Sequence, residues 1–142
     1  MTQSQRKTQI AIYSDDSSVR QGITNALGKK IATDLPEHEI HEFATGAALR
    51  AFIDRKTIDK TFPIDLFILD GEATPEGGLG VARQLKDEVF KCPPVLAIIG
   101  RPQDAWLAAW SRAEASVIHP IDPFTLANTV ADLLRTHSLA TA

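Results

Sequence analysis

Three carboxylates follow apolar runs in this sequence. Asp15 and Asp16 follow the run that ends at Tyr13, with Ser14 between them and that run, and Asp70 comes directly after the run Ile64–Leu69. An ionised carboxylate at the end of a buried segment is costly to desolvate unless water, a partner or a cation meets it. Three acids gathered in one place would repel one another unless a hard divalent cation held them, and magnesium is the natural candidate. The alternative is that Asp15 and Asp16 only cap the helix that follows them.

The elements that must position these acids follow an α/β pattern. Short apolar runs alternate with longer segments of helical period, which predicts parallel strands joined by covering helices. The expected strands are Gln9–Tyr13, Glu39–Ala44, Ile64–Leu69, Val95–Ile99 and Ala115–Ile118. The expected helices begin at Ser17 or Ser18, then span Gly46–Asp54, Leu79–Phe90 and Asp104–Ala113, and the last begins at Asp122 or Thr125. In an open parallel sheet the carboxyl ends of the first and third strands can meet in one crevice, which brings the three acids together.

Length and composition fit one globular domain. The chain has 142 residues, 44% hydrophobic and 23% charged, the ordinary balance of a soluble domain with a real core. We expect this domain to span residues 9–135, between flexible ends at residues 1–8 and 136–142.

Charge and hydropathy limit the partners. The net charge is -3, and no basic cluster runs beyond Lys29-Lys30, which argues against nucleic acid as a direct partner. No apolar run approaches membrane-spanning length, and the polar start lacks the apolar core of a signal peptide. We therefore expect no membrane association and a cytoplasmic location.

The chain resembles the receiver domain of bacterial response regulators in three segments: YSDDSSVRQGI, LFILDGEATPEGGLGVARQL and VIHPIDPFTL. The resemblance covers nearly the whole chain and implies a flavodoxin-like fold, a doubly wound five-stranded parallel sheet with strand order 2-1-3-4-5. Asp70 then matches the aspartate that takes a phosphoryl group from a sensor kinase. Asp15 matches the acid that binds Mg²⁺ directly, Glu72 would offer its main-chain carbonyl to the metal, and Asp16 would compensate in the outer shell.

Four positions depart from the family's pattern, and all of them are among the residues with which the family recognises the phosphoryl group and responds to it. The family has an acid where Ser14 stands, a hydroxyl residue at Ile99, an aromatic switch at Ser116 and a lysine at His119. Ile99 cannot donate a hydrogen bond, and an imidazole carries the missing positive charge only when it is protonated. We therefore expect phosphate-driven switching to be weak or different. The peptide bond before Pro120 should be cis, like the matching lysine-proline bond of the family.

Trp106 and Trp110 stand four residues apart, which places them on one face of a helix. Core packing and contact with a partner are equally compatible with this spacing. In receivers the fourth helix, the fifth strand and the fifth helix form the usual output surface. The resemblance therefore implies a protein partner at that face, with the two tryptophans as part of it.

These features predict a stand-alone, atypical receiver, not an enzyme, that works in two-component signalling by binding another protein. A phosphorylation-independent adaptor with the same fold is the first alternative. The second is a metal-dependent phosphatase, because the order DGEAT from Asp70 to Thr74 also resembles the nucleophile loop of haloacid-dehalogenase-type enzymes. Two features argue against this alternative. The second acid of that family is normally Asp, where this chain has Glu72, and the family needs a downstream lysine, whereas no lysine follows Lys91 in this chain. The sequence leaves open the kinase, the output partner and a homodimer.

Overall fold

The apolar runs form the parallel sheet that the sequence predicts. The computed structural model describes residues 6–58 and 64–141, and within them five parallel strands lie in the order β2-β1-β3-β4-β5. The strands are β1 (Thr8–Tyr13), β2 (His38–Phe43), β3 (Leu66–Asp70), β4 (Val95–Ile99) and β5 (Ala115–Ile118). The helices are α1 (Ser17–Leu27), α2 (Gly46–Ile58), α3 (Gly78–Glu88), the 3-10 helix η1 (Pro102–Asp104), α4 (Ala105–Trp110) and α5 (Pro123–Thr141). This is the expected doubly wound, flavodoxin-like α/β architecture.

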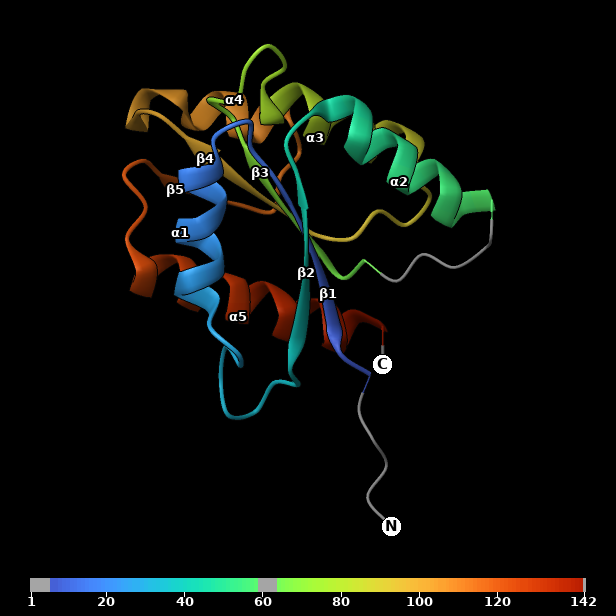
Figure 1. The fold of residues 1–142 in the computed structure, drawn as a ribbon, viewed down its shortest axis with the longest axis vertical. Coiled ribbons are helices and arrows are strands. Elements are labelled where there is room, and N and C mark those ends of the chain that lie inside the picture. Colours follow the sequence, from blue (N-terminus) through green and yellow to red (C-terminus); the bar gives the residue numbers. More distant parts are fainter. Residues whose placement is uncertain (1–5, 59–63, 142) are drawn as a thin grey trace.

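The helices form two layers, one on each face of the sheet (Figure 1). α1 and α5 pack on each other against one face, and α2, α3 and α4 cover the other. Successive side chains of β3 alternate between these layers: Ile68 joins the core under α1 and α5, whereas Phe67 and Leu69 join the core under α2 and α3. Every residue of β3 and β4 is buried, as strands covered on both faces require. Asp70, the last residue of β3, is therefore enclosed by both layers.

Asp16 caps α1. Its carboxylate accepts hydrogen bonds from the backbone N–H of Ser18 at 2.9 Å and from the Ser18 hydroxyl at 2.7 Å. The hydrogen bond from the Ser18 hydroxyl is the main reason why the pKa of Asp16 lies below its usual value. The cap is therefore Asp16 rather than Ser17 or Ser18, and the capping alternative considered for this acid is correct.

α4 is shorter than the sequence predicts. It was expected over Asp104–Ala113 and covers Ala105–Trp110. The buried hydroxyl of Ser111 donates to the carbonyl of Ala108 at 2.6 Å, and Arg112 adopts a φ of 65°. A residue with a side chain in the left-handed region cannot continue a right-handed helix, so α4 ends there.

α5 is longer than the sequence predicts. It continues to Thr141, into the segment expected to be a flexible tail from residue 136, because no glycine or internal proline interrupts it. At the other end of the chain, β1 begins at Thr8, whose N–H donates to the carbonyl of Glu37 at 2.8 Å. The rest of the expected flexible start, residues 1–5, lies outside the described residues. No helix within the described part of the chain is long and apolar enough to cross a membrane.

His38, at the start of β2, gives the fold a dependence on pH. Its Nδ1 atom is buried and has no hydrogen-bond partner among the described residues. Burial lowers the pKa of the ring below its ordinary value of 6.5. The unfolded chain therefore binds a proton more readily than the folded chain. The contribution of His38 to stability is present above about pH 6.5 and is lost as the pH falls below it.

We expect the free energy of unfolding to decrease between about pH 7.5 and about pH 5.5, and His38→Gln to reduce this decrease. Urea denaturation at each pH measures it. His41→Gln is the matched control, because it changes the other histidine of β2, whose Nε2 lies 2.6 Å from Gln9 Oε1. If both variants flattened the pH profile equally, the assignment to His38 would be wrong.

Candidate functional site

The Asp70 carboxylate is the centre of the site. Asp70 is 2% exposed at the carboxyl end of β3, and three groups from separate segments surround it. The hydroxyl of Ser14 donates to Oδ2 at 2.7 Å, and the N–H of Glu72 donates to Oδ1 at 2.9 Å. His119 Nε2 lies 3.0 Å from Oδ1. Both carboxylate oxygens are therefore engaged by groups of this chain, which is how a buried acid avoids an unfavourable desolvation.

The backbone brings these groups together because three strands end side by side. Ser14 follows β1, the neighbour of β3 in the sheet, and is fully buried. Arg20 of α1 fixes its backbone by donating to the Ser14 carbonyl at 2.6 Å. His119 follows β5 and reaches past the end of β4, where its N–H donates to the carbonyl of Ile99 at 2.9 Å. The His119–Pro120 peptide bond is cis, as the resemblance implies.

Asp15 lies at the same end of the sheet, but its carboxylate is directed to another partner. Its two oxygens accept hydrogen bonds from the N–H and from the hydroxyl of Thr74, each at 3.1 Å. Thr74 belongs to the β3–α3 loop, residues 71–77. It precedes a second cis proline, Pro75, which sequence reasoning did not predict. Asp15 therefore clamps the loop that follows Asp70.

The expected magnesium site is not assembled from these acids. Asp16 caps α1, Asp15 binds Thr74, and Asp70 is held by Ser14, as described above. Among the described residues, no group of three or more Asp, Glu, His or Cys side chains could hold a metal ion. The repulsion that motivated the prediction is relieved in another way, since each acid has its own hydrogen-bond donors. In this arrangement each acid is held by hydrogen bonds, and a magnesium site at Asp15, Asp70 and the main-chain carbonyl of Glu72, with Asp16 in its outer shell, stays a prediction.

The β3–α3 loop is anchored at Glu76 as well. The hydroxyl of Tyr13, a fully buried residue of β1, donates to the Glu76 carbonyl, and burial raises the pKa of this phenol. The Glu76 carboxylate pairs with Arg50 of α2. It also lies over Gly46, where a Cβ atom would stand 1.9 Å from its Oε1. Side chains of β1 and α2 thus hold this loop from two sides.

Gly78 sets the distance between α3 and β3. A Cβ atom at this position would stand 2.6 Å from the carbonyl oxygen and 2.8 Å from the nitrogen of Asp70, closer than non-bonded atoms approach. The start of α3 is therefore seated on the backbone of Asp70. Glu72 lies nearby with its carboxylate over Gly100, and its N–H rather than its carbonyl faces the Asp70 side chain.

Two of the altered positions make no hydrogen bond to Asp70 in the described part of the chain. Ile99, the last residue of β4, is buried in a small core with Ala97 and Ala108, so α4 packs where the family has a hydroxyl. Ser116 of β5 is exposed. Of the four departures from the family pattern, Ser14 and His119 are the two that hydrogen-bond to the carboxylate among the described residues.

Trp106 and Trp110 are exposed, at 68% and 47% of their surface, so the hypothesis of core packing is wrong for both. The guanidinium of Arg83 lies 5.1 Å from the centre of the Trp110 ring and donates to the Trp110 carbonyl at 2.7 Å. Arg83 belongs to α3. Trp110 therefore lies on the side of α4 that faces α3, and a partner surface formed by α4, β5 and α5 stays a prediction.

We expect Ser14→Ala to lower the free energy of unfolding by about 2 kcal/mol, because it removes one donor from a buried, ionised acceptor. Ser17→Ala at an exposed position of α1 is the control and should change stability by less than about 0.5 kcal/mol. Urea denaturation measures both variants. Equal stability of the Ser14 variant and the wild type would show that the hydrogen bond to Asp70 contributes nothing.

The fold recurs in solved receiver structures. The BeF3-activated receiver domain of DrrB from Thermotoga maritima aligns with a TM-score of 0.68 at 17% identity, over 92% of this chain and 99% of that one. The chemotaxis response regulator CheY4 of Vibrio cholerae aligns with a TM-score of 0.69 at 18% identity, over 90% and 99%. A putative response regulator from Chloroflexus aurantiacus gives 0.70 at 19% identity, over 92% and 99%. At these identities the likeness concerns the fold.

Similarity in sequence is closer to two curated proteins, although no family model matches the chain. Both are named as uncharacterized response regulatory proteins, from the CDC 1551 / Oshkosh and the ATCC 25618 / H37Rv strains of Mycobacterium tuberculosis. Each is 50% identical over 135 residues, which cover 95% of this chain and 97% of the relative. The receiver fold and this identity along nearly the whole length lead to one conclusion: the chain belongs to the response regulator family and forms a receiver domain.

Proposed function

We propose that this receiver acts by binding another protein, and that its binding depends little on phosphorylation of Asp70. The observation that carries the proposal is the set of hydrogen bonds on the Asp70 carboxylate, to Ser14, Glu72 and His119. It favours the phosphorylation-independent adaptor over a response regulator that is switched by a sensor kinase. Because each of these bonds stabilises the ionised carboxylate, each also makes it a weaker nucleophile toward a phosphoryl donor.

A phosphoryl group would also find few groups that bind it here. A ligand shifts a conformational equilibrium only by its differential contacts with the two states. Ile99 has no donor and is buried against Ala108, and Ser116 is too small to act as an aromatic switch. Receiver domains typically bind Mg²⁺, but Asp15 and Asp16 hold Thr74 and Ser18 instead. The contacts that convert phosphorylation into a changed surface in the family are therefore reduced to His119.

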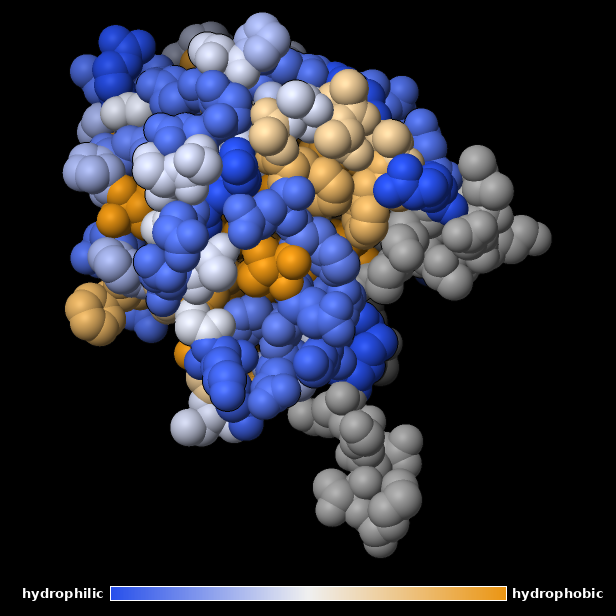
Figure 2. All heavy atoms as spheres, in the orientation of Figure 1, coloured by the Kyte–Doolittle hydropathy of each residue, from blue (hydrophilic) through white to orange (hydrophobic). Residues whose placement is uncertain are grey.

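The partner surface that we propose is the α4 aromatic patch, defined as Trp106 and Trp110. Trp106 and Trp110 are both exposed, and tryptophan is enriched among the residues that dominate binding energy. Another apolar area covers the point where β2 leads into α2 (Figure 2). Its exposed residues are alanines, at positions 44, 47, 48 and 51, which offer much less side-chain area than two indoles. The α4 aromatic patch is the better candidate.

Kinases and other proteins are the partners of receiver domains in general, and receivers generally signal rather than catalyse. We propose that this chain also binds a kinase or another protein, that it signals rather than catalyses, and that it is located in the cytoplasm. A phosphatase activity is not part of the proposal, since Glu72 stands where that enzyme family normally has Asp and its downstream lysine is missing.

Beryllofluoride with magnesium tests the dependence on Asp70. Fluorescence of the two tryptophans, both on α4, reports any rearrangement of that helix. We expect no change in the wild type, because the contacts that would bind the mimic are missing. The triple variant Ser14→Asp, Ile99→Thr and His119→Lys restores the family's residues and should gain a magnesium-dependent response. A saturable response of the wild type would contradict the proposal.

A second experiment tests the surface. After a partner has been isolated by co-purification with the wild type, its affinity is measured for Asp70→Asn and for the double variant Trp106→Ala, Trp110→Ala. We expect the Asp70 variant to bind within about tenfold of the wild type, or 1.4 kcal/mol, and the double variant to lose more. Phe124→Ala, which removes an exposed aromatic ring at the start of α5, is the matched control. The reverse order of the two losses would assign recognition to Asp70 instead of α4.

A further inference from the structure

A cavity of about 290 Å³ lies between α2 and α3, the two helices that stand side by side over the same face of the sheet (Figure 1). None of the residues that hydrogen-bond to Asp70 lines it. Its volume is close to the lower limit of the range of about 300–1,000 Å³ that small-molecule sites occupy. The cavity therefore suits a compact ligand.

The floor of the cavity is apolar and is held in place by the core. It is formed by two residues of each helix: Leu49, Ile53, Val81 and Leu85. Each of them is at most 5% exposed, and all belong to the core between these helices and the sheet. A ligand that packs on this floor would require little rearrangement of the protein, which favours binding.

A polar bridge joins the two helices at the cavity. Arg50 of α2 donates from Nε to Oε1 of Gln84, a residue of α3, at 3.0 Å. The guanidinium of Arg50 also pairs with the Glu76 carboxylate. Arg50 is the cation among the described residues that line the cavity, and Glu76 therefore compensates its charge.

One turn further along both helices, two acids line the cavity. Asp54 follows Arg50 by four residues, and Glu88 follows Gln84 by four. Residues with this spacing share one face of a helix, so each acid lies on the face that forms the bridge. Both helices connect parallel strands and therefore run in the same direction. Asp54 and Glu88 are thus the next pair across the cavity, and this pair consists of like charges.

The charges of this pair are not compensated within the described part of the chain. Neither Asp54 nor Glu88 forms an ion pair with a described residue. The neighbouring cation of α3, Lys86, pairs with Glu114, and Arg55 of α2 does not line the cavity. α3 ends at Glu88, where the negative end of the helix dipole adds to the field of the carboxylates. This end of the cavity therefore favours a cation.

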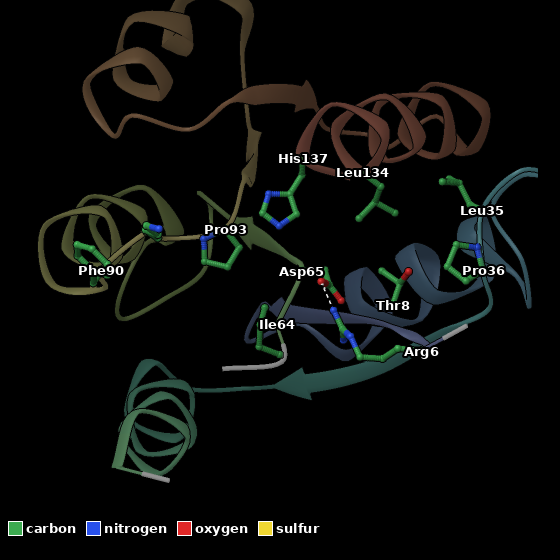
Figure 3. A pocket seen from close by; sticks show the side chains of 11 residues that line it. Arg6, Thr8, Leu35, Pro36, Ile64, Asp65, Phe90, Pro93, Leu134 and His137 are labelled. Atoms are coloured by element: carbon green, nitrogen blue, oxygen red, sulfur yellow. Dashed lines mark hydrogen bonds and ion pairs between the residues drawn. The ribbon is translucent and has the colours of Figure 1, made fainter. Parts of the chain in front are cut away.

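A larger cavity, of about 580 Å³, shows the opposite situation at the amino-terminal ends of β1 and β3 (Figure 3). Its acid, Asp65, has partners on both oxygens. Arg6 Nη2 lies 2.6 Å from Oδ1, and the N–H of Gln9 donates to Oδ2 at 2.8 Å. The cavity between α2 and α3 differs because its two acids have no such partners among the described residues.

From this arrangement we infer that the cavity between α2 and α3 binds a small alkylammonium ion, with its ammonium group between Asp54 and Glu88 and its alkyl body on the apolar floor. An ammonium group has three N–H donors and can donate to both carboxylates at once. Binding relieves the repulsion between the two acids and removes the alkyl chain from water. This inference is independent of the function proposed for Asp70 and α4.

Titration of the full chain with three probes tests the inference, followed by the backbone amide signals in a ¹H–¹⁵N spectrum. Hexylamine is protonated at about pH 7, like a lysine side chain. Hexanol carries the same tail without a charge, and hexanoate carries it with the opposite charge. We expect saturable shifts at Ile53, Leu85 and Glu88 with hexylammonium, at a Kd of about 1 mM, and at least tenfold weaker binding of the other two probes. Equal binding of hexanol, saturable shifts confined to other residues, or no saturation with hexylammonium would overturn the inference.

Variants separate the cavity from a general attraction of cations to an acidic protein. Asp54→Asn and Glu88→Gln should each weaken hexylammonium binding at least threefold, and together at least tenfold, with hexanol unchanged. Both acids occupy exposed helix positions, so we expect these variants to fold. Asp132→Asn is the matched control, because it removes an exposed carboxylate of α5, on the opposite face of the sheet, and should leave the affinity as it is. Unchanged binding in both single variants, or an equal loss in the control, would remove the basis of the inference.

Discussion

The burial of one carboxylate sets the requirements that the rest of the site meets. Asp70 ends a strand that is covered on both faces, so its charge cannot rely on water, and removing an ionised group from water without partners costs several kcal/mol. Donors arrive from the end of β1, from the loop after β3 and from the end of β5. The strand order makes this possible, since β1 borders β3 directly and only β4 separates β3 from β5.

The same constraint explains why the neighbouring acids do not form a cluster. The hydroxyl of Ser14 neutralises part of the field of Asp70 at a position where the family has another acid. Asp15 is then free to hold Thr74, and Asp16 to cap α1. A site that resembles a metal centre in its sequence is, in the folded chain, a set of separate hydrogen bonds.

The fold was predictable because apolar residues repeat periodically along its strands and helices. The site was less predictable because its hydrogen bonds follow no such period. The apolar runs predicted the bounds of β4 and β5, and the resemblance to receiver domains implied the strand order. The end of α4 depends on the hydrogen bond from the Ser111 hydroxyl to the carbonyl of Ala108. The periodicity of apolar residues does not predict such a bond. Likewise, the position of Asp15 after β1 predicts that it lies at the same end of the sheet as Asp70. Whether its carboxylate binds a metal or Thr74 depends on a donor 59 residues away in the sequence. The helical spacing of the two tryptophans predicted that they share one face of a helix, but it did not predict that this face is exposed.

The contact between Arg83 and Trp110 makes the two indoles unequal. An exposed side chain that must become fixed on binding loses rotamer freedom, at a cost of order 0.5–1.5 kcal/mol. Trp110 is already restrained, since Arg83 stacks on its ring and bonds its backbone, whereas Trp106 is the more exposed of the two. Trp110 therefore presents a preorganised surface, and Trp106 an adaptable one. A partner that docks here would meet a fixed point first, with a second ring beside it that can adjust to the shape of the contact.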